Sequence, residues 1–446
     1  MKLLRLNMYK KINYIVAIMA LFASVSVKAQ VTSQSPYSRY GLGNVNSLLL
    51  PQFKAMGGIS TGVYRPDGYS NINMQNPATY SGIMMTAVDI GASVEFKKLK
   101  QGSLSEGSFN GSLSHIALAF PLNPGRTGLS FGLLPFTDVG YQYTKNSGYA
   151  ANGSSTLDST AFNNRYSGEG GLNKAYLGLG QQFGDYVRIG ANVEYIFGNL
   201  IQTQTIEPVT YPAYNTRQQI KNSVGGIGFS YGAQFEIPLS TKSRITLGYS
   251  GSASSSISSD RSTVLTRFPF DPSTGEENPA SYVTVDSVQQ NGIKLKLPLM
   301  HNFGFSIQRD NKWMIGADFR TGKWSKLTMD GVNDGLQDSW GFSAGGQITP
   351  DINSIGSYFN RMDYRAGFTY DKTYMRISSQ DIKQMAVTFG FGLPLVYNRY
   401  AVYKINLTTE LGKRGSMTNG LVQENYINIH LGFTLNDTWF KRFRFD

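Results

Sequence analysis

The sequence predicts an all-β fold: a transmembrane antiparallel β-barrel of about 14 strands, with an N-terminal hatch, or plug, in its lumen. Three observations predict this fold. Segments of alternating polarity recur along most of the chain, the connections between them alternate between short and long, and an export signal precedes them. Charged residues make up only 16% of the chain, which argues against disorder.

Residues 1–29 have the features of a secretory signal peptide. A basic start is followed by an apolar run from Ile12 to Val25, and Val27 and Ala29 supply small residues before the expected cleavage site. The apolar run is shorter than the ~20 residues that a membrane-spanning helix needs. We therefore expect export and cleavage after Ala29, rather than a membrane anchor.

Segments with a two-residue period predict the strands. Between Tyr426 and Leu435, for example, polar residues and glycine alternate with isoleucine, leucine and phenylalanine. A soluble β-sandwich array or a propeller would show domain linkers or a longer repeat, and we find neither. The fourteen predicted strands span residues 83–97, 111–121, 127–144, 170–183, 186–206, 221–238, 243–256, 299–308, 312–328, 336–348, 361–372, 384–394, 401–412 and 425–436.

The connections between these strands alternate in length, as they do in outer-membrane barrels. The longest, residues 257–298, is expected to be a solvated loop, a cap over the extracellular mouth or a docking site for a partner. The basic cluster Lys97–Lys100 would lie near the same end, where it could meet lipopolysaccharide. An even number of strands puts both termini on the short-turn side, which is the periplasm of a Gram-negative cell. The other long connections span residues 98–110, 145–169, 207–220, 373–383 and 413–424.

The chain therefore divides into four parts. Residues 1–29 are the signal peptide, 30–82 the hatch, 83–436 the barrel, and 437–446 a basic periplasmic tail. The alternative for the second part is a disordered periplasmic tail. Its apolar residues around Leu48–Ile59 favour a position in the lumen.

Composition excludes several kinds of site. The chain has no cysteine, and its three histidines, His115, His301 and His430, are far apart, so no metal or cofactor is expected. Five of the 41 basic residues belong to the signal peptide. The remaining excess of seven over 29 acidic residues does not call for a nucleic-acid partner. Ser114 precedes His115 in a strand and is expected to face the opposite way, so no Ser/His/acid set and no enzyme is predicted.

Two short motifs carry a resemblance to a known family. Asn76-Pro77-Ala78 precedes the first strand, and Pro135-Phe136 interrupts the third. With a glycine-rich N-terminal segment and fourteen strands, the chain resembles the long-chain fatty acid transporter (FadL/TodX-like) barrels, of a type found in Bacteroidetes. It departs from that pattern at Thr137-Asp138, where the family usually continues with glycine.

The resemblance implies an outer-membrane channel for hydrophobic, fatty-acid-like molecules. Asn76, Pro77 and Ala78 would belong to the gating hatch, and Pro135 and Phe136 to a kink that lets ligand exit sideways into the membrane. The partners would be a hydrophobic ligand, outer-membrane lipids and lipopolysaccharide. The plainer interpretations are a turn at Asn76-Pro77 and a strand end at Pro135. The alternative function is a non-transporting subunit of an outer-membrane assembly or secretion complex, with other outer-membrane proteins as partners.

Overall fold

The computed structural model describes residues 35–69, 71–147, 161–208, 214–269, 277, 281–398 and 400–438. These residues belong to one compact unit, Ser33–Asp446. The predicted signal peptide and most of the predicted tail lie outside the described residues. No helix among the described residues is long and apolar enough to span a membrane.

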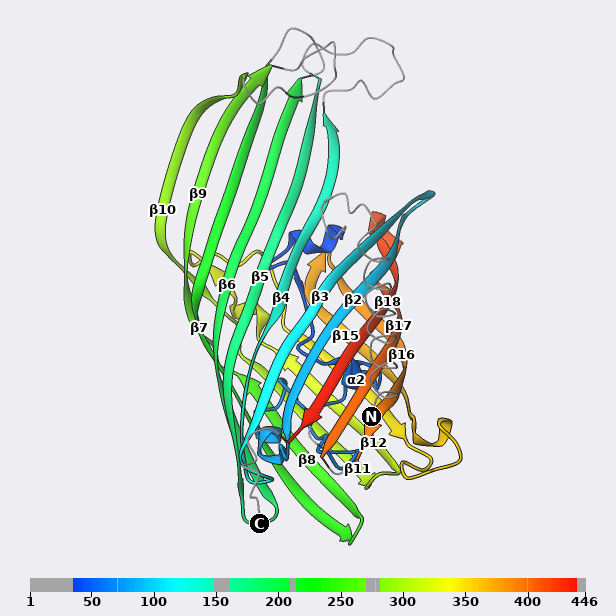
Figure 1. Ribbon diagram of the computed structural model, residues 1–446. Coiled ribbons are helices and arrows are strands. Elements are labelled where there is room, and N and C mark those ends of the chain that lie inside the picture. The colour runs from blue at the N-terminus through cyan, green and yellow to red at the C-terminus, as the bar shows by residue number, and fades with distance from the viewer. Residues whose placement is uncertain are drawn as a thin grey trace, which may run out of the picture. The chain divides into compact units, whose positions relative to one another are not determined.

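The described residues form a closed antiparallel barrel of fourteen strands (Figure 1), as predicted. The barrel closes where β18 pairs with β2, from Asp437 opposite Thr86 to Gln423 opposite Lys100. Two of the fourteen are each broken into two pieces. The strands are β2 (Thr86–Gln101), β3 (Leu104–Asn123), β4 (Thr127–Ser147), β5 (Phe162–Phe183), β6 (Val187–Pro208), β7 (Tyr214–Ser240), β8 (Ser243–Ser252) with β9 (Ser256–Pro269), β10 (Val283–Lys296) with β11 (Met300–Arg309), β12 (Trp313–Gly322), β14 (Ser339–Ile348), β15 (Asp363–Ile377), β16 (Gln380–Tyr397), β17 (Ala401–Arg414) and β18 (Gln423–Asp437).

Each strand exposes apolar side chains on its outer face, as a wall in contact with lipid requires. Small polar residues, glycines and charged residues alternate with them on the inner face. This alternation is what the two-residue period predicted. The exposed apolar residues include Ile90, Leu122, Leu133, Leu177, Val193, Phe229, Leu247, Phe305, Ile315, Phe342, Phe368, Phe389, Leu411 and Leu431.

The prediction of loops at the long-loop end is wrong in part, because several of these residues form strands. Residues 257–298 form most of β9 and β10, and residues 98–110 form a tight β2–β3 hairpin. These strand extensions are rich in Ser, Thr, Asn and Gln, so they lack the apolar alternation that marks a membrane strand. Ladder hydrogen bonds stabilise them all the same. Lys97 is also not at the surface. Its side chain faces the lumen, where Nζ lies 2.8 Å from Glu95 Oε1.

Six strands, β4, β5, β6, β7, β9 and β10, continue beyond the rest at the long-loop end as one curved sheet (Figure 1). We call this the extension sheet. One of its edges is β10, whose residues Val283–Gly292 are exposed on both faces. On the side away from β9, only Leu295 and Lys296 of β10 pair with a neighbouring strand, the two-residue β13 (Thr328–Met329).

Residues 35–83, which we call the lumenal segment, lie inside the barrel. They contain η1 (Pro36–Arg39), β1 (Asn44–Val45), α2 (Pro51–Lys54) and η2 (Pro77–Gly82). Short 3-10 turns elsewhere are η4 (Trp324–Lys326), η5 (Phe359–Arg361) and η6 (Thr418–Gly420). Buried side chains of the lumenal segment pack with inward-facing wall residues in two apolar clusters.

The two clusters fill the lumen at different heights. The first joins the start of the lumenal segment to connections at the long-loop end, and the second surrounds α2 and η2. Because both consist of buried side chains in mutual contact, they leave a packed interior at these heights. The first includes Tyr37, Leu42, Val139, Leu172, Ile196, Ile257, Trp324, Leu327, Tyr374 and Leu421, and the second Leu50, Phe53, Met56, Ile59, Val63, Tyr80, Ala117, Tyr176 and Met314.

Candidate functional site

The lumenal segment docks on glycines of the barrel wall. A Cβ atom at Gly190 would overlap the carbonyl group of Pro77 and lie 2.7 Å from the backbone nitrogen of Ala78, and one at Gly180 would lie 2.6 Å from the carbonyl oxygen of Pro77. The missing side chains therefore let backbone meet backbone. Other inward glycines in close contact with the segment are Gly128, Gly232, Gly248, Gly304, Gly345, Gly367 and Gly390.

Asn76, Pro77 and Ala78 lie at the centre of this docked surface. Asn76 is fully buried, donates from Nδ2 to the Thr61 carbonyl oxygen at 2.8 Å, and accepts from the Ala78 amide at 3.2 Å. It thereby caps η2, and Pro77 occupies the first position of that helix. The motif is thus a helix start that also docks the lumenal segment against the wall.

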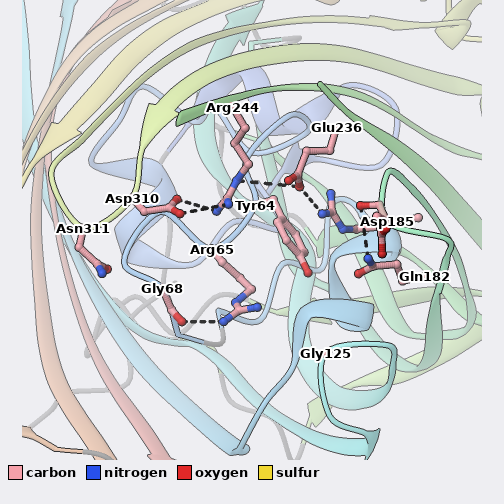
Figure 2. Close-up of a pocket in the computed structure, with 11 residues that line it drawn as sticks. Tyr64, Arg65, Gly68, Gly125, Gln182, Asp185, Glu236, Arg244, Asp310 and Asn311 are labelled. Carbon is pink, nitrogen blue, oxygen red and sulfur yellow. Dashed lines mark hydrogen bonds and ion pairs between the residues drawn. The ribbon is translucent and has the colours of Figure 1, made fainter. Parts of the chain in front are cut away.

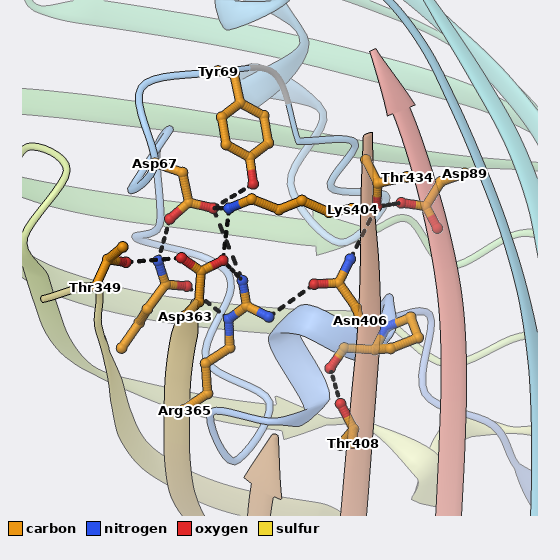
Figure 3. Close-up of polar contacts among 12 residues, drawn as sticks. Asp67, Tyr69, Asp89, Thr349, Asp363, Arg365, Lys404, Asn406, Thr408 and Thr434 are labelled. Carbon is orange, nitrogen blue, oxygen red and sulfur yellow. Dashed lines mark hydrogen bonds and ion pairs between the residues drawn. The ribbon is translucent and has the colours of Figure 1, made fainter. Parts of the chain in front are cut away.

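A buried ionic cluster ties the lumenal segment to the opposite wall (Figure 3). Lys404 Nζ on β17 lies 2.6 Å from Asp363 Oδ2 on β15 and 3.3 Å from Asp67 Oδ2 on the lumenal segment. Arg365 donates to the same Asp363 oxygen at 2.8 Å, and Tyr69 donates to Asp67 at 2.8 Å. All five side chains are buried, so each charge depends on its partners.

Hydrogen bonds continue from this cluster along the wall (Figure 3). Arg365 donates to Asn406 at 2.8 Å, Asn406 to Thr434 at 3.0 Å, and Thr434 to Asp89 at 2.6 Å. The inward-facing polar residues of β15, β17, β18 and β2 therefore form one connected network. Buried polar groups satisfied in this way fix a unique arrangement of the surrounding strands.

The prediction that Ser114 and His115 face apart is wrong. The β2–β3 register shifts between Gly91 and Ala92, so Ser114 is an extra residue in β3. Its Oγ lies 2.9 Å from His115 Nδ1, and His115 Nε2 lies 2.7 Å from Asp89 Oδ1. A bulge breaks the strict alternation on which the prediction rested. These three residues extend the network to the edge of β3.

Acidification should loosen the ionic cluster. Burial by itself disfavours the charged form of Asp67, but Lys404, Arg365 and hydrogen bonds from Tyr69 and Gln347 outweigh it and hold its pKa below the usual value. Its contribution to stability is therefore present above the unfolded pKa of about 3.9 and is lost as the pH falls through the lower folded pKa. We expect urea unfolding midpoints of wild type and Asp67→Asn to differ at pH 7 and to converge below about pH 4. An unchanged difference at pH 3 would contradict the role of the Asp67 charge.

Strand pairing changes near Pro135-Phe136. The β4–β5 register shifts between Pro135 and Thr137, which makes Phe136 a bulge residue, and β3–β4 pairing ends at Ile116 opposite Leu133. Beyond this point the edge of β4 bonds the lumenal segment instead. Asn44 and Val45 of β1 pair with Asp138 and Thr137, and the Ser35 amide donates to the Gly140 carbonyl oxygen at 2.8 Å.

A polar cavity of about 480 Å³ lies at the short-turn end of the barrel (Figure 2). Tyr64, Arg65 and Gly68 of the lumenal segment form one side, and the ends of short turns form the rest. A second cavity, beside Phe53 and Asn73, has only about 10 Å³. Among the described residues there is no group of three or more His, Asp or Glu placed to hold a metal ion.

Sequence reasoning found the two motifs but missed the ionic cluster. Its members are up to 337 positions apart, so no local motif contains them. One signal was present. Asp363 and Arg365 are two positions apart in one strand, and Lys404 and Asn406 are two positions apart in another. The alternation of side chains in these strands places all four on the face that points into the lumen. A charged residue on the inward face of a strand costs free energy to bury and therefore needs a partner.

The fold and the site together define a class: an outer-membrane β-barrel with a chain segment packed in its lumen. A family model described as BamG matches residues 8–446, and the chain belongs to the BamG family. The fold and the family point to the outer membrane. No curated protein matches the chain.

Several solved structures share the fold. A FadL homologue from Pseudomonas aeruginosa is 12% identical with a TM-score of 0.57, and covers 89% of this chain and 100% of its own. The toluene transporter TodX from P. putida is 14% identical with a TM-score of 0.55, and the aligned region covers 87% of this chain and 98% of TodX. The CymD monoaromatic hydrocarbon channel is 13% identical with a TM-score of 0.53, and the aligned region covers 90% of this chain and 99% of CymD. At such identities the likeness concerns the fold alone.

Proposed function

We propose that this chain is a closed barrel that serves as a subunit of an outer-membrane protein assembly or secretion complex. The observation that carries the proposal is the packed lumen. Two apolar clusters and the buried ionic cluster occupy the space between the lumenal segment and the wall. The family model that matches is BamG rather than one of the hydrocarbon channels, so the shared fold alone does not bring transport to this chain.

The extension sheet supports the same proposal. A long exposed strand edge is a template for pairing with another chain, and proteins usually shorten, cover or charge such edges. The edge of β10 instead carries Val283, Val285 and Val288, which are 45–62% exposed. In this proposal the short-turn end and both termini face the periplasm. On the outer side of the membrane, a strand of a partner protein pairs with the exposed edge of β10.

The lumen proposal is tested by ion conductance in planar lipid bilayers. We expect the full-length mature protein to show no stable conductance, and a variant lacking residues 35–80 to conduct. Because that deletion removes the lumenal side of both apolar clusters and takes Asp67 and Tyr69 out of the ionic cluster, the variant must first show the heat-dependent gel mobility of a closed barrel. Steady ohmic conductance by the full-length protein would contradict the closed lumen.

The partner proposal is tested by purification from the native membrane in mild detergent. We expect a constant set of protein partners with wild type and their loss with the double variant Val285→Lys/Val288→Lys, because charges on an edge oppose strand addition. Thr241→Lys, in a turn at the other end, is the matched control and should keep the partners. An isolated single chain from the native membrane would refute the proposal.

The second candidate is passage of a hydrophobic, fatty-acid-like molecule. The observation that favours it is the loss of β3–β4 pairing beyond Leu133, which supports a sideways exit at Pro135 and Phe136 after movement of Asn76, Pro77 and Ala78. Native mass spectrometry with lipid extraction distinguishes the two candidates. An apolar molecule present at close to one per chain, without protein partners, would favour transport.

A further inference from the structure

The polar cavity at the short-turn end has the features of a binding site (Figure 2). It is built from parts of the chain that are remote in sequence: the lumenal segment, the β5–β6 hairpin, the ends of β7 and β8, and the β11–β12 turn. Its lining residues lie at the short-turn end of the barrel, away from the lipid-facing band. A ligand therefore reaches it from the aqueous side.

Three arginines meet in this cavity around one aromatic ring. The guanidinium carbons of Arg188, Arg244 and Arg65 lie 3.4, 5.8 and 5.9 Å from the centre of the Tyr64 ring. Two of them have carboxylate partners, since Arg188 pairs with Glu236 and Arg244 lies 2.9 Å from Asp310. The third, Arg65, forms no ion pair with any described residue, and it donates only to the Gly68 carbonyl oxygen at 2.7 Å.

The cavity also holds hydrogen-bonding atoms without partners among the described residues. Nε and Nη1 of Arg188 and Nε of Arg65 are buried donors of this kind, and Asn311 Oδ1 is a buried acceptor. Arg188 is only 2% exposed, so these donors are costly to leave unmet. The residues around the cavity therefore hold several cationic donors and one neutral acceptor that lack partners among the described residues.

Two of these residues have an unusual backbone conformation. Arg65 has φ 44° and Asn311 has φ 55°, both in the left-handed region. Asparagine tolerates that region, whereas an arginine there is uncommon and costs of order 1 kcal/mol. Glycine would fit position 65 with less strain. An arginine thus occupies a position where the backbone conformation alone favours glycine.

We propose that this cavity binds the C-terminal carboxylate of a polypeptide presented at the short-turn end. The carboxylate accepts from Arg65 and Arg188, and the peptide N–H next to it donates to Asn311 Oδ1. A phosphodiester headgroup offers acceptors only and leaves Asn311 Oδ1 unmet, so the mixture of free donors and a free acceptor favours a peptide end over such a headgroup. The inference rests on the proposed function, because it names a feature of the partner.

The test uses full-length mature protein in detergent micelles and a degenerate hexapeptide pool. One arm has a free C-terminal carboxylate, the second is the same pool amidated at the C-terminus, and the third is inorganic phosphate. We expect adducts of the free pool in native mass spectrometry, at least about tenfold weaker binding of the amidated pool, and no competition by millimolar phosphate. Equal binding of both pools, displacement by phosphate or no adducts at all would overturn the proposal.

Arg65→Gly separates binding from folding. It removes the guanidinium and relieves the backbone, so the variant should keep the heat-dependent gel mobility of wild type and lose at least about tenfold in affinity for the free pool. Arg309→Gln is the matched control, because Arg309 is exposed at the same end but does not line the cavity. Unchanged affinity in Arg65→Gly would refute the site. Neither readout depends on conductance or on co-purification, so a failure here is distinguishable from a failure of the proposed function.

Discussion

Replacing Lys404 by methionine is expected to destabilise the protein by about 3–5 kcal/mol. The Lys404 side chain is 1% exposed and lies between the carboxylates of Asp67 and Asp363. Removing its charge leaves two buried carboxylates with Arg365 as their only cationic neighbour among the described residues. The measurement is the urea unfolding midpoint in lipid vesicles, together with protease sensitivity of the lumenal segment, which should rise because Asp67 loses its strongest contact with the wall.

The matched control for this change is Lys383→Met. Lys383 is exposed on β16, so its replacement should change stability by no more than about 0.5 kcal/mol. A double variant sharpens the result. Asp67→Asn together with Lys404→Met should cost less than the sum of the two single changes, because each removes the same interaction. Additive effects would show that Asp67 and Lys404 do not stabilise each other.

Replacing Gly190 by valine is expected to displace the lumenal segment and to cost about 1–3 kcal/mol. The new side chain would occupy the space of the Pro77 carbonyl group and of the Ala78 amide. Since backbone cannot rotate away as a side chain can, η2 must move off the wall. Ion conductance in a planar bilayer measures this displacement, and we expect openings that wild type lacks.

Gly111→Val is the matched control for the glycine change. A Cβ atom at Gly111 has no heavy atom within 4 Å, and valine suits a strand, so stability and conductance should stay at wild-type values. A Gly190→Val protein that remains as stable and as closed as wild type would show that the lumenal segment does not depend on close contact with β6.

Prediction from the sequence succeeded where side-chain alternation is the direct consequence of the environment. A membrane strand must face lipid on one side and the lumen on the other, so β18 shows its period plainly in the residues from Tyr426 to Leu435. The extension sheet was missed because β9 and β10 face water, where no apolar face is required. Ser114 was placed wrongly because a bulge of one residue leaves no mark in the local sequence.

The candidate site was predicted only in its local parts. Asn76-Pro77 carries its own helix cap, and Pro135 lacks an amide hydrogen, so both act on their immediate neighbours and are visible in the sequence. The wall partners of Asp67 lie on strands up to 337 positions away along the chain, and Gly190 meets Pro77 and Ala78 of η2, which are also remote in sequence. Their pairing depends on the register of the closed barrel.

The sequence by itself therefore determined the barrel and its strand number, because both follow from local alternation and connection length, and it predicted a separate segment before the first strand. Only the tertiary structure decided that this segment is packed against wall glycines, that one lysine joins two distant aspartates, and that three arginines share one tyrosine ring. The physical reason is closure. Bringing β18 against β2 sets the radius and the register of every strand, and these decide which inward-facing residues meet across the lumen.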